Sequence, residues 1–174
     1  MTPDKIPLWI LIGLPGSGKS TWADLFMGLD PPYGLISTDR IRAQLYGDEA
    51  IQGNWGVIWA EVTAQFERHA DLIRAGTWGG SLYDATNTRR GDRHLVIDTA
   101  SRAGFNAIFA MWFNVPLQTC LARNQRRSRH VPPEVIHRMA RQLAGAPPHW
   151  SEGFAGVFRY NPSNLRQPNR DRLD

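Results

Sequence analysis

The sequence predicts an α/β fold, a three-layer sandwich in which a central, mostly parallel sheet lies between two layers of helices. Apolar runs of strand length alternate with longer segments of helical periodicity, which is typical of parallel strands joined by crossover helices. The first apolar run, residues 8–13, leads directly into a glycine-rich loop and then into a helix. With 174 residues, the chain is long enough for one domain with a substantial core, and we expect residues 1–174 to form it.

The bounds of the expected elements follow from apolar periodicity and from the residues that begin and end helices. Gly28, Gly76 and Gly104 each end a helical stretch, and Pro116 opens one. Ser37 or Thr38 is expected to cap the helix that follows it. We expect strands at residues 8–13, 34–37, 81–83, 107–113 and 156–160, and helices at residues 19–27, 39–45, 54–75, 90–102, 116–127 and 133–144.

Residues 13–20 fit the pattern G-x-x-x-x-G-K-[ST] of a phosphate-binding loop, or P-loop. Glycines let successive backbone N–H groups point inward at phosphate oxygens, and the dipole of the following helix favours an anion. Lys19 is expected to bind the β- and γ-phosphates of a nucleotide, and the Ser20 hydroxyl to be a ligand of Mg²⁺. The loop therefore predicts a P-loop NTPase fold with ATP and Mg²⁺ as its ligands.

Asp39 and Arg42 follow the second expected strand, at the sheet edge where the P-loop also lies. A carboxylate at this edge can accept the proton of an acceptor hydroxyl, as the base of a kinase must. Arg42 shares a helix face with Asp39 and can hold an anionic group of the acceptor. The alternative interpretation is a carboxylate that caps a helix beside a surface arginine.

The segment Asp84-Ala85-Thr86-Asn87 closes the third expected strand. Asp84 is expected to orient Mg²⁺, and Thr86 and Asn87 to bind substrate. The alternative is an Asx turn that caps the next helix.

Residues 116–144 are expected to form a helical lid over the nucleotide. Arg123, Arg126 and Arg127 share a helix face, and Arg129 follows in the connection to the next helix. An anionic ligand would turn their mutual repulsion into attraction, whereas the alternative is a solvated basic face. Another pair one helical turn apart, Trp55 and Trp59, is interpreted as core packing in preference to base stacking.

Composition limits the class of protein. The net charge is +4, and all basic residues except Lys5 and Lys19 are arginines, which suit phosphate recognition and are compatible with nucleic acid. A single cysteine, Cys120, suits a reducing compartment, and no apolar stretch is long enough to cross a membrane. We therefore expect a cytoplasmic protein without a membrane partner.

These motifs together resemble those of the 5′-hydroxyl polynucleotide kinases of phage and bacteria, within a wider P-loop group that includes zeta-toxin-like and tRNA-directed kinases. The resemblance spans residues 7–161. It is carried by Gly13-Leu14-Pro15-Gly16-Ser17-Gly18-Lys19-Ser20-Thr21, by Asp39-x-x-Arg42, by Asp84-Ala85-Thr86-Asn87, and by Arg123-x-x-x-Arg127 ahead of Val131-Pro132-Pro133-Glu134-Val135-Ile136.

The resemblance implies roles for individual residues. The residues of the loop, 13–21, and Arg123 would bind ATP, Asp39 would be the general base, and Arg42 would hold the phosphate next to the acceptor hydroxyl. Arg127 would act on the transferring phosphoryl group. The lid loop is about one residue shorter than in the phage enzyme, which leaves the choice between Arg126 and Arg127 open.

The expected function is that of an ATP-dependent kinase whose acceptor is the 5′-hydroxyl of RNA or DNA. A kinase of a small molecule, such as a sugar, nucleoside or antibiotic, is the alternative within the same class. A nucleotide-binding switch without phosphoryl transfer is the alternative from another class. The sequence does not determine the oligomeric state.

Overall fold

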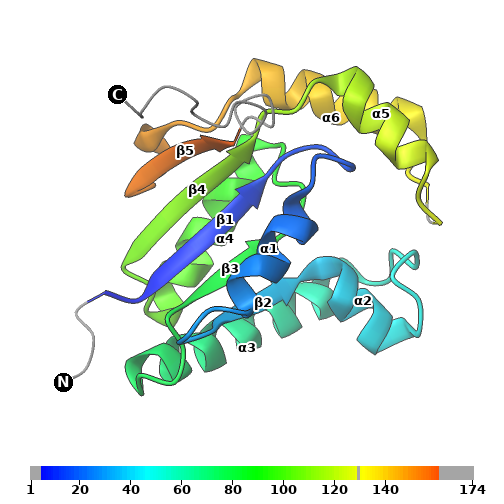
Figure 1. Cartoon of the computed structure of the whole chain (residues 1–174). Coiled ribbons are helices and arrows are strands. Elements are labelled where there is room, and N and C mark those ends of the chain that lie inside the picture. The colour runs from blue at the N-terminus through cyan, green and yellow to red at the C-terminus, as the bar shows by residue number, and fades with distance from the viewer. Residues whose placement is uncertain (1–4, 129, 161–174) are drawn as a thin grey trace, which may run out of the picture.

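A parallel sheet in the strand order β2-β3-β1-β4-β5 forms the centre of the structure (Figure 1). The structure is a computed structural model that describes residues 5–128 and 130–160. Its strands are β1 (Pro7–Ile12), β2 (Tyr33–Ser37), β3 (Gly80–Asp84), β4 (Ala107–Phe113) and β5 (Gly156–Tyr160). Every described strand pair is parallel. The expected α/β fold with a mostly parallel sheet is therefore confirmed.

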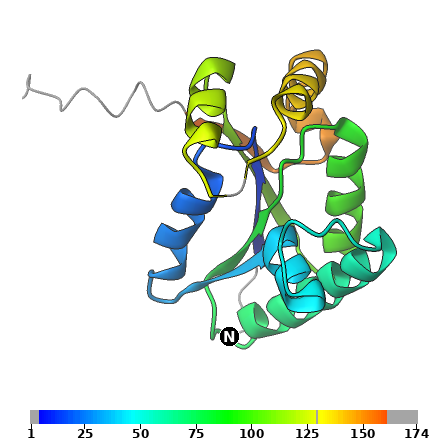
Figure 2. The same cartoon turned by 90° about the vertical axis from the view of Figure 1, so that its right-hand side faces the viewer.

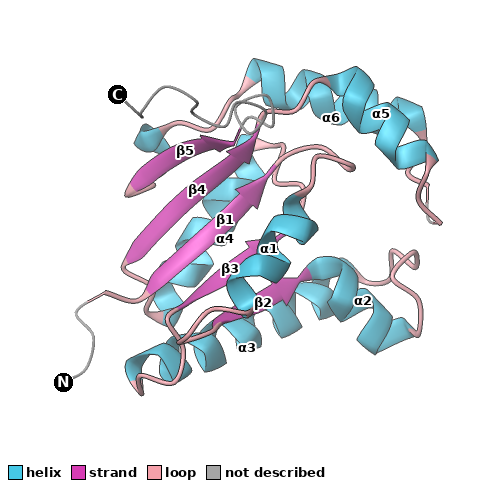
Figure 3. Cartoon of the chain, in the orientation of Figure 1, coloured by secondary structure: helices cyan, strands magenta, loops and turns pink. Residues whose placement is uncertain are grey.

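Helices cover both faces of this sheet (Figures 2 and 3). They are α1 (Lys19–Met27), α2 (Thr38–Tyr46), α3 (Trp55–Arg74), α4 (Arg90–Ala103), α5 (Leu117–Gln125) and α6 (Pro133–Gly145), and a 3₁₀ turn, η1 (Trp150–Glu152), precedes β5. The expected elements are all present, with bounds shifted by at most about two residues. The largest shift is at α5, which ends at Gln125 and not at residue 127, because the N–H of Arg126 turns back to the carbonyl of Arg123.

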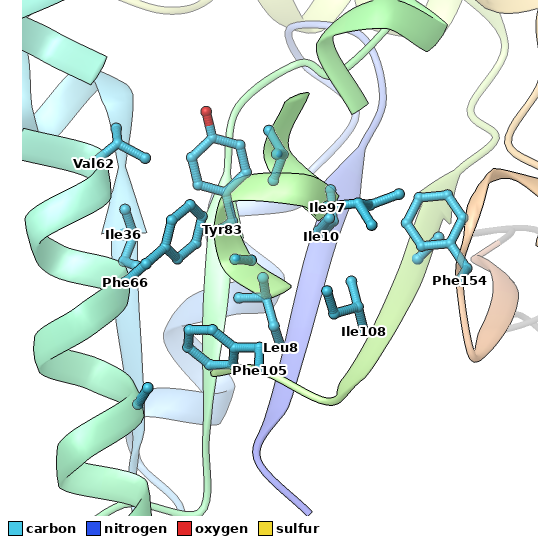
Figure 4. Close-up of a cluster of buried hydrophobic side chains, with 14 of the residues drawn as sticks. Leu8, Ile10, Ile36, Val62, Phe66, Tyr83, Ile97, Phe105, Ile108 and Phe154 are labelled. Atoms are coloured by element: carbon cyan, nitrogen blue, oxygen red, sulfur yellow. The ribbon is translucent and has the colours of Figure 1, made fainter. Parts of the chain in front are cut away.

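The side chains of β1 alternate between two apolar cores, one on each face of the sheet. Leu8, Ile10 and Ile12 join the core beneath α3 and α4, part of which Figure 4 shows, whereas Leu11 joins the core beneath α1 and α5. Both faces of this central strand are buried, which explains why its sequence is an almost continuous apolar run. Leu143 of α6 belongs to the first core and Ile136 to the second, so this helix bridges both.

The carboxyl ends of the strands all point to one edge of the sheet. In Figure 1 the pair α5 and α6 projects beyond this edge on one side, and α2 with the loop that follows it projects on the other. The P-loop lies between them, after β1. Ligands of open parallel sheets bind at this edge, so the topology brings together the loops that the sequence motifs occupy.

A buried arginine fixes the loop between β3 and α4. Arg93 of α4 is fully buried and donates from Nε and Nη2 to the carboxylate of Glu152, at 2.6 and 2.7 Å. It also donates to the carbonyls of Asn87 (3.2 Å), Thr88 (3.4 Å) and Ala146 (2.9 Å). Arg93 thus connects the loop after β3 with the end of α6 and with η1.

No helix within the described ranges is long and apolar enough to cross a membrane.

Candidate active site

The P-loop is held in its curled shape by contacts of its own residues and by α5. Gly16 has a φ of +80°, and a Cβ atom at this position would lie 2.6 Å from the carbonyl oxygen of Cys120. Both the backbone conformation and the close approach of α5 therefore require glycine. Lys19 is buried, and its Nζ donates to the carbonyls of Gly13 (2.9 Å) and Leu14 (3.0 Å). Its ammonium group thus lies inside the loop that would surround a phosphate.

Ser20 and Asp84 meet across the sheet edge. The Ser20 hydroxyl donates to Oδ2 of Asp84 at 2.7 Å, although the two residues lie 64 positions apart. A hydroxyl beside a single buried carboxylate fits Mg²⁺, which is usually held by one or two carboxylates together with phosphate oxygens and water. The described residues contain no group of three or more metal-binding His, Cys, Asp or Glu side chains. This donor set therefore suits a metal ion that binds together with a nucleotide.

Burial shifts the ionisation of the two charged groups at this point. It lowers the pKa of the Lys19 ammonium, an effect that Asp84 and Asp39 oppose and that Arg127 reinforces. It raises the pKa of the Asp84 carboxyl, which Lys19 and the hydrogen bond from Ser20 counteract. Asp84, Arg127 and Asp39, which come from three separate segments, thus all lie near enough to Lys19 to influence its pKa.

Asp39 lies in the first turn of α2, directly after β2. The Ser37 side chain caps this helix by accepting from the backbone N–H of Arg40, as expected. Arg42 donates from Nη1 to Oδ1 of Asp39 at 2.8 Å. The Asp39 side chain is 46% exposed, whereas that of Arg42 is 13% exposed. The hydrogen bond from Arg42 thus orients the Asp39 carboxylate, which stays partly exposed to solvent.

The Nε atom of Arg42 is buried and has no hydrogen-bond partner among the described residues. Buried polar donors in proteins are rarely left without a partner, and this one is covered by protein atoms, so it is not directly open to a ligand.

The loop after β3 combines structural and solvent-facing groups. The backbone of Thr86 accepts from the N–H of Gly13 at 3.0 Å, which ties the loop to the end of β1. Asn87 has a φ of +50°, and its Nδ2 donates to the carbonyls of Leu11 (2.7 Å) and Ala85 (3.3 Å). The Asn87 amide nitrogen is therefore engaged within the protein. Substrate binding by Thr86 and Asn87 stays a prediction.

The segment from α5 to α6, which the sequence predicts to be a lid, brings arginines to the P-loop and to the cavity beside it. Nη1 of Arg123 donates to the carbonyl of Gly16 at 3.4 Å, so α5 contacts the P-loop directly. Asn124 bonds both backbone groups of Val131, at 2.8 and 3.1 Å, and closes the connection between α5 and α6. Arg127 lines the central cavity, and Arg126 does not. Arg129 lies outside the described residues.

These groups surround one cavity of about 1280 Å³. It is larger than the roughly 300–1,000 Å³ typical of sites for one small ligand, so it can hold a nucleotide and a second molecule. The P-loop, Arg123 and Arg127 line this cavity together with Asp39, Arg42 and the loop after β3. The structure brings together the side chains that the motifs predict, from segments more than 100 residues apart.

Two features of the site differ from expectation or were missed. Trp55 is 49% exposed and lines the cavity, so the interpretation of both tryptophans as core residues is wrong for Trp55, although Trp59 does pack against the core. Arg93 was not recognised as a residue that fixes the site. A signal existed, because Arg93 shares a helix face with the apolar residues Val96, Ile97 and Ala100.

Comparison with known proteins identifies the family and the fold of this chain. A family model described as an AAA domain matches residues 8–146, which is most of the chain. Among solved structures, a chain of a Pnkp1/Rnl/Hen1 complex aligns with a TM-score of 0.60 and 24% identity, covering 76% of this chain and 42% of that one. This chain thus spans less than half of that relative.

Two other structures match over most of both chains. The Deinococcus radiodurans tunicamycin resistance protein has a TM-score of 0.60 and 12% identity, with coverage of 88% and 86%. A gluconokinase from Sinorhizobium meliloti has a TM-score of 0.55 and 15% identity, with coverage of 93% and 84%. At these identities the likeness concerns the fold. The family match over residues 8–146, together with the P-loop and the parallel sheet, shows that the chain belongs to the AAA domain family of P-loop proteins.

Proposed function

We propose that this protein is an ATP- and Mg²⁺-dependent phosphotransferase that phosphorylates a hydroxyl group, with the 5′-hydroxyl of RNA or DNA as its acceptor. One observation carries the proposal. A partly exposed carboxylate, Asp39, is hydrogen-bonded to Arg42 in the cavity that the P-loop, Arg123 and Arg127 also line. A switch that only binds a nucleotide has no need of such a base.

In the proposed reaction, Lys19 binds the β- and γ-phosphates of ATP, and Arg127 meets the charge that develops on the transferring group. Mg²⁺ bound at Ser20 and Asp84 would neutralise part of the phosphate charge. Asp39 accepts the proton of the acceptor hydroxyl. The acceptor oxygen then bonds to the γ-phosphorus, the bond from that phosphorus to the bridging oxygen breaks, and ADP leaves.

The choice of a nucleic acid acceptor rests on positive charge in the cavity. Arg42, Arg89 and Arg138 line it in addition to Arg123 and Arg127. The polynucleotide kinase motifs agree with this choice. Because ATP and nucleic acids meet in the cytoplasm, we place the activity there.

A small-molecule acceptor is the second candidate. It is supported by the likeness in fold to a gluconokinase and to a tunicamycin resistance protein.

The test is transfer of labelled γ-phosphate from ATP to an oligonucleotide with a 5′-hydroxyl, with the same oligonucleotide bearing a 5′-phosphate as control. The proposal predicts labelling of the first only, loss of labelling in Lys19→Ala, and a decrease in activity as salt concentration rises. Phosphorylation of a neutral sugar without any transfer to oligonucleotides would establish the small-molecule alternative. ATP binding without transfer to any acceptor would establish the switch.

A further inference from the structure

The start of α3 presents an aromatic surface to the cavity. The rings of Trp55 and Trp59 stack with centroids 5.9 Å apart and planes inclined by 27°. Trp59 packs against the core on its other side, and Trp55 remains half exposed, yet both line the cavity that contains Asp39. A large apolar ring on a cavity wall stays in contact with water until a ligand covers it, so covering it is favourable.

We propose that Trp55, supported by Trp59, is a stacking platform for the base of the acceptor, so that the acceptor is a nucleotide unit with a planar ring next to its phosphate. This inference rests on the proposed kinase function and assigns the residues that would bind the base of its acceptor.

The platform is held in a fixed place by the loop that joins α2 to α3. The backbone N–H of Asn54 donates to the Tyr46 hydroxyl at 3.0 Å, and the Asn54 side chain caps α3 by accepting from the N–H of Gly56. Gly53 has a φ of +59°, and a Cβ atom there would overlap the Tyr46 ring. Asp39 and Arg42 lie in the first half of α2, and Tyr46 is its last residue. The same helix therefore fixes the position of Trp55 relative to the Asp39 carboxylate.

The placement of the platform separates it from the nucleotide side. In Figure 2, which faces the strand ends, α5 and α6 lie at the top and α2 with the start of α3 lies at the bottom. Trp55, at the start of α3, therefore lies on the side of α2, which carries Asp39 and Arg42, and away from α5, which carries Arg123. The cavity is large enough for both ligands.

The adjacent charges indicate what the ring is attached to. The guanidinium-bearing residues Arg42 and Arg89 both line the cavity that Trp55 lines. An aromatic face next to guanidinium groups matches a nucleobase and its phosphate, which lie on opposite sides of one sugar. A sugar without a base would form ion pairs with the arginines only if it carried a negative charge. It would also have no planar ring to stack on Trp55.

The test compares a nucleoside 3′-monophosphate with its abasic analogue, both of which carry a 5′-hydroxyl and a 3′-phosphate. For the wild-type protein, we expect kcat/KM to be roughly 10- to 100-fold higher with the base than without it, as alanine substitutions of stacking residues indicate. Trp55→Ala should lower kcat/KM for the base-containing acceptor to the value for the abasic acceptor, and it should leave kcat/KM for the abasic acceptor unchanged. Trp55→Phe should retain most of the difference. Trp150→Ala, which removes an exposed tryptophan outside the cavity, is the matched control.

Equilibrium binding of the same two compounds, measured by calorimetry without ATP, separates this inference from the kinase proposal. Turnover of both acceptors at equal rates, or an equal loss for both in Trp55→Ala, would overturn the platform and leave the kinase intact. Base-dependent binding that Trp55→Ala abolishes, without any phosphoryl transfer, would support the platform and overturn the kinase. Failure to bind or phosphorylate either compound would overturn both.

Discussion

Replacing Arg93 with methionine should lower the free energy of unfolding, because it removes the donor that connects a buried hydrogen-bond network. The Glu152 side chain, only 2% exposed, would lose both of its short bonds to Arg93, and breaking a buried ion pair from one side costs about 3–5 kcal/mol. Arg90, whose Nε lies 3.8 Å from Glu152, compensates in part. We therefore expect a loss near the lower end of that range, about 3 kcal/mol, against a typical total of about 5–15 kcal/mol.

Urea denaturation followed by circular dichroism measures this free energy of unfolding. The matched control is Arg102→Met on the same helix, where an ion pair to Asp98 at 2.8 Å is exposed and contributes at most about 1 kcal/mol. The double variant Arg93→Met/Glu152→Gln should recover only part of the loss, because three carbonyl groups still lack their donor. A loss below about 1 kcal/mol in Arg93→Met, or one no larger than that of Arg102→Met, would refute the role assigned to this residue.

Two further predictions concern the predicted lid and His69, a buried histidine of α3. Arg127→Ala should reduce kcat by roughly 10³-fold or more with little change in ATP affinity. Arg126→Ala should reduce it much less, because of these two arginines only Arg127 lines the cavity. Steady-state kinetics in which Arg126→Ala has the larger effect would assign the role to Arg126 and contradict this prediction. Burial lowers the pKa of His69 to about 4, so the folded state binds fewer protons than the unfolded state below pH 6.5. Stability should therefore fall by about 3 kcal/mol as the pH decreases from 6.5 to 4, and urea titrations should show this dependence reduced in His69→Gln but retained in His94→Gln, a change at an exposed position.

The order of strands and helices was predictable because each element carries its own local signal. The apolar run of β1, the glycines after helices and the proline before α5 act within a few residues, and the structure confirms the elements that they indicate. The P-loop was equally legible, since its residue types follow from backbone geometry that phosphate binding requires. The end of α5 was harder to predict from the sequence, because the turn at Arg126 depends on how the connection to α6 closes.

What sequence reasoning missed depends on contacts between distant residues. Arg93 finds Glu152 59 positions away, and no local pattern identifies that partner. Asn87 has helix-capping chemistry in sequence, but in the structure its amide nitrogen bonds to the carbonyl of Leu11 in another strand. The two tryptophans of α3 follow the same helical period, yet the loop after α2 leaves one of them open to the cavity. Periodicity reports which face of a helix is apolar, and not where the neighbouring segments stop covering it.

The central claim is that Asp39 is the base of a phosphoryl transfer, and Asp39→Asn tests it most directly. Asparagine preserves the shape of the side chain and can still bond to Arg42, but it cannot take the proton of an acceptor hydroxyl. Single-turnover transfer from labelled ATP to the acceptor should slow by about 10²–10⁴-fold, nearer the lower value if the transition state is loose, while ATP binding stays equal or becomes tighter. Asp84→Asn is the comparison, and it should weaken the response to Mg²⁺ as well as the rate. A fully active Asp39→Asn protein would contradict the account and reduce Asp39 to a residue of the first turn of α2.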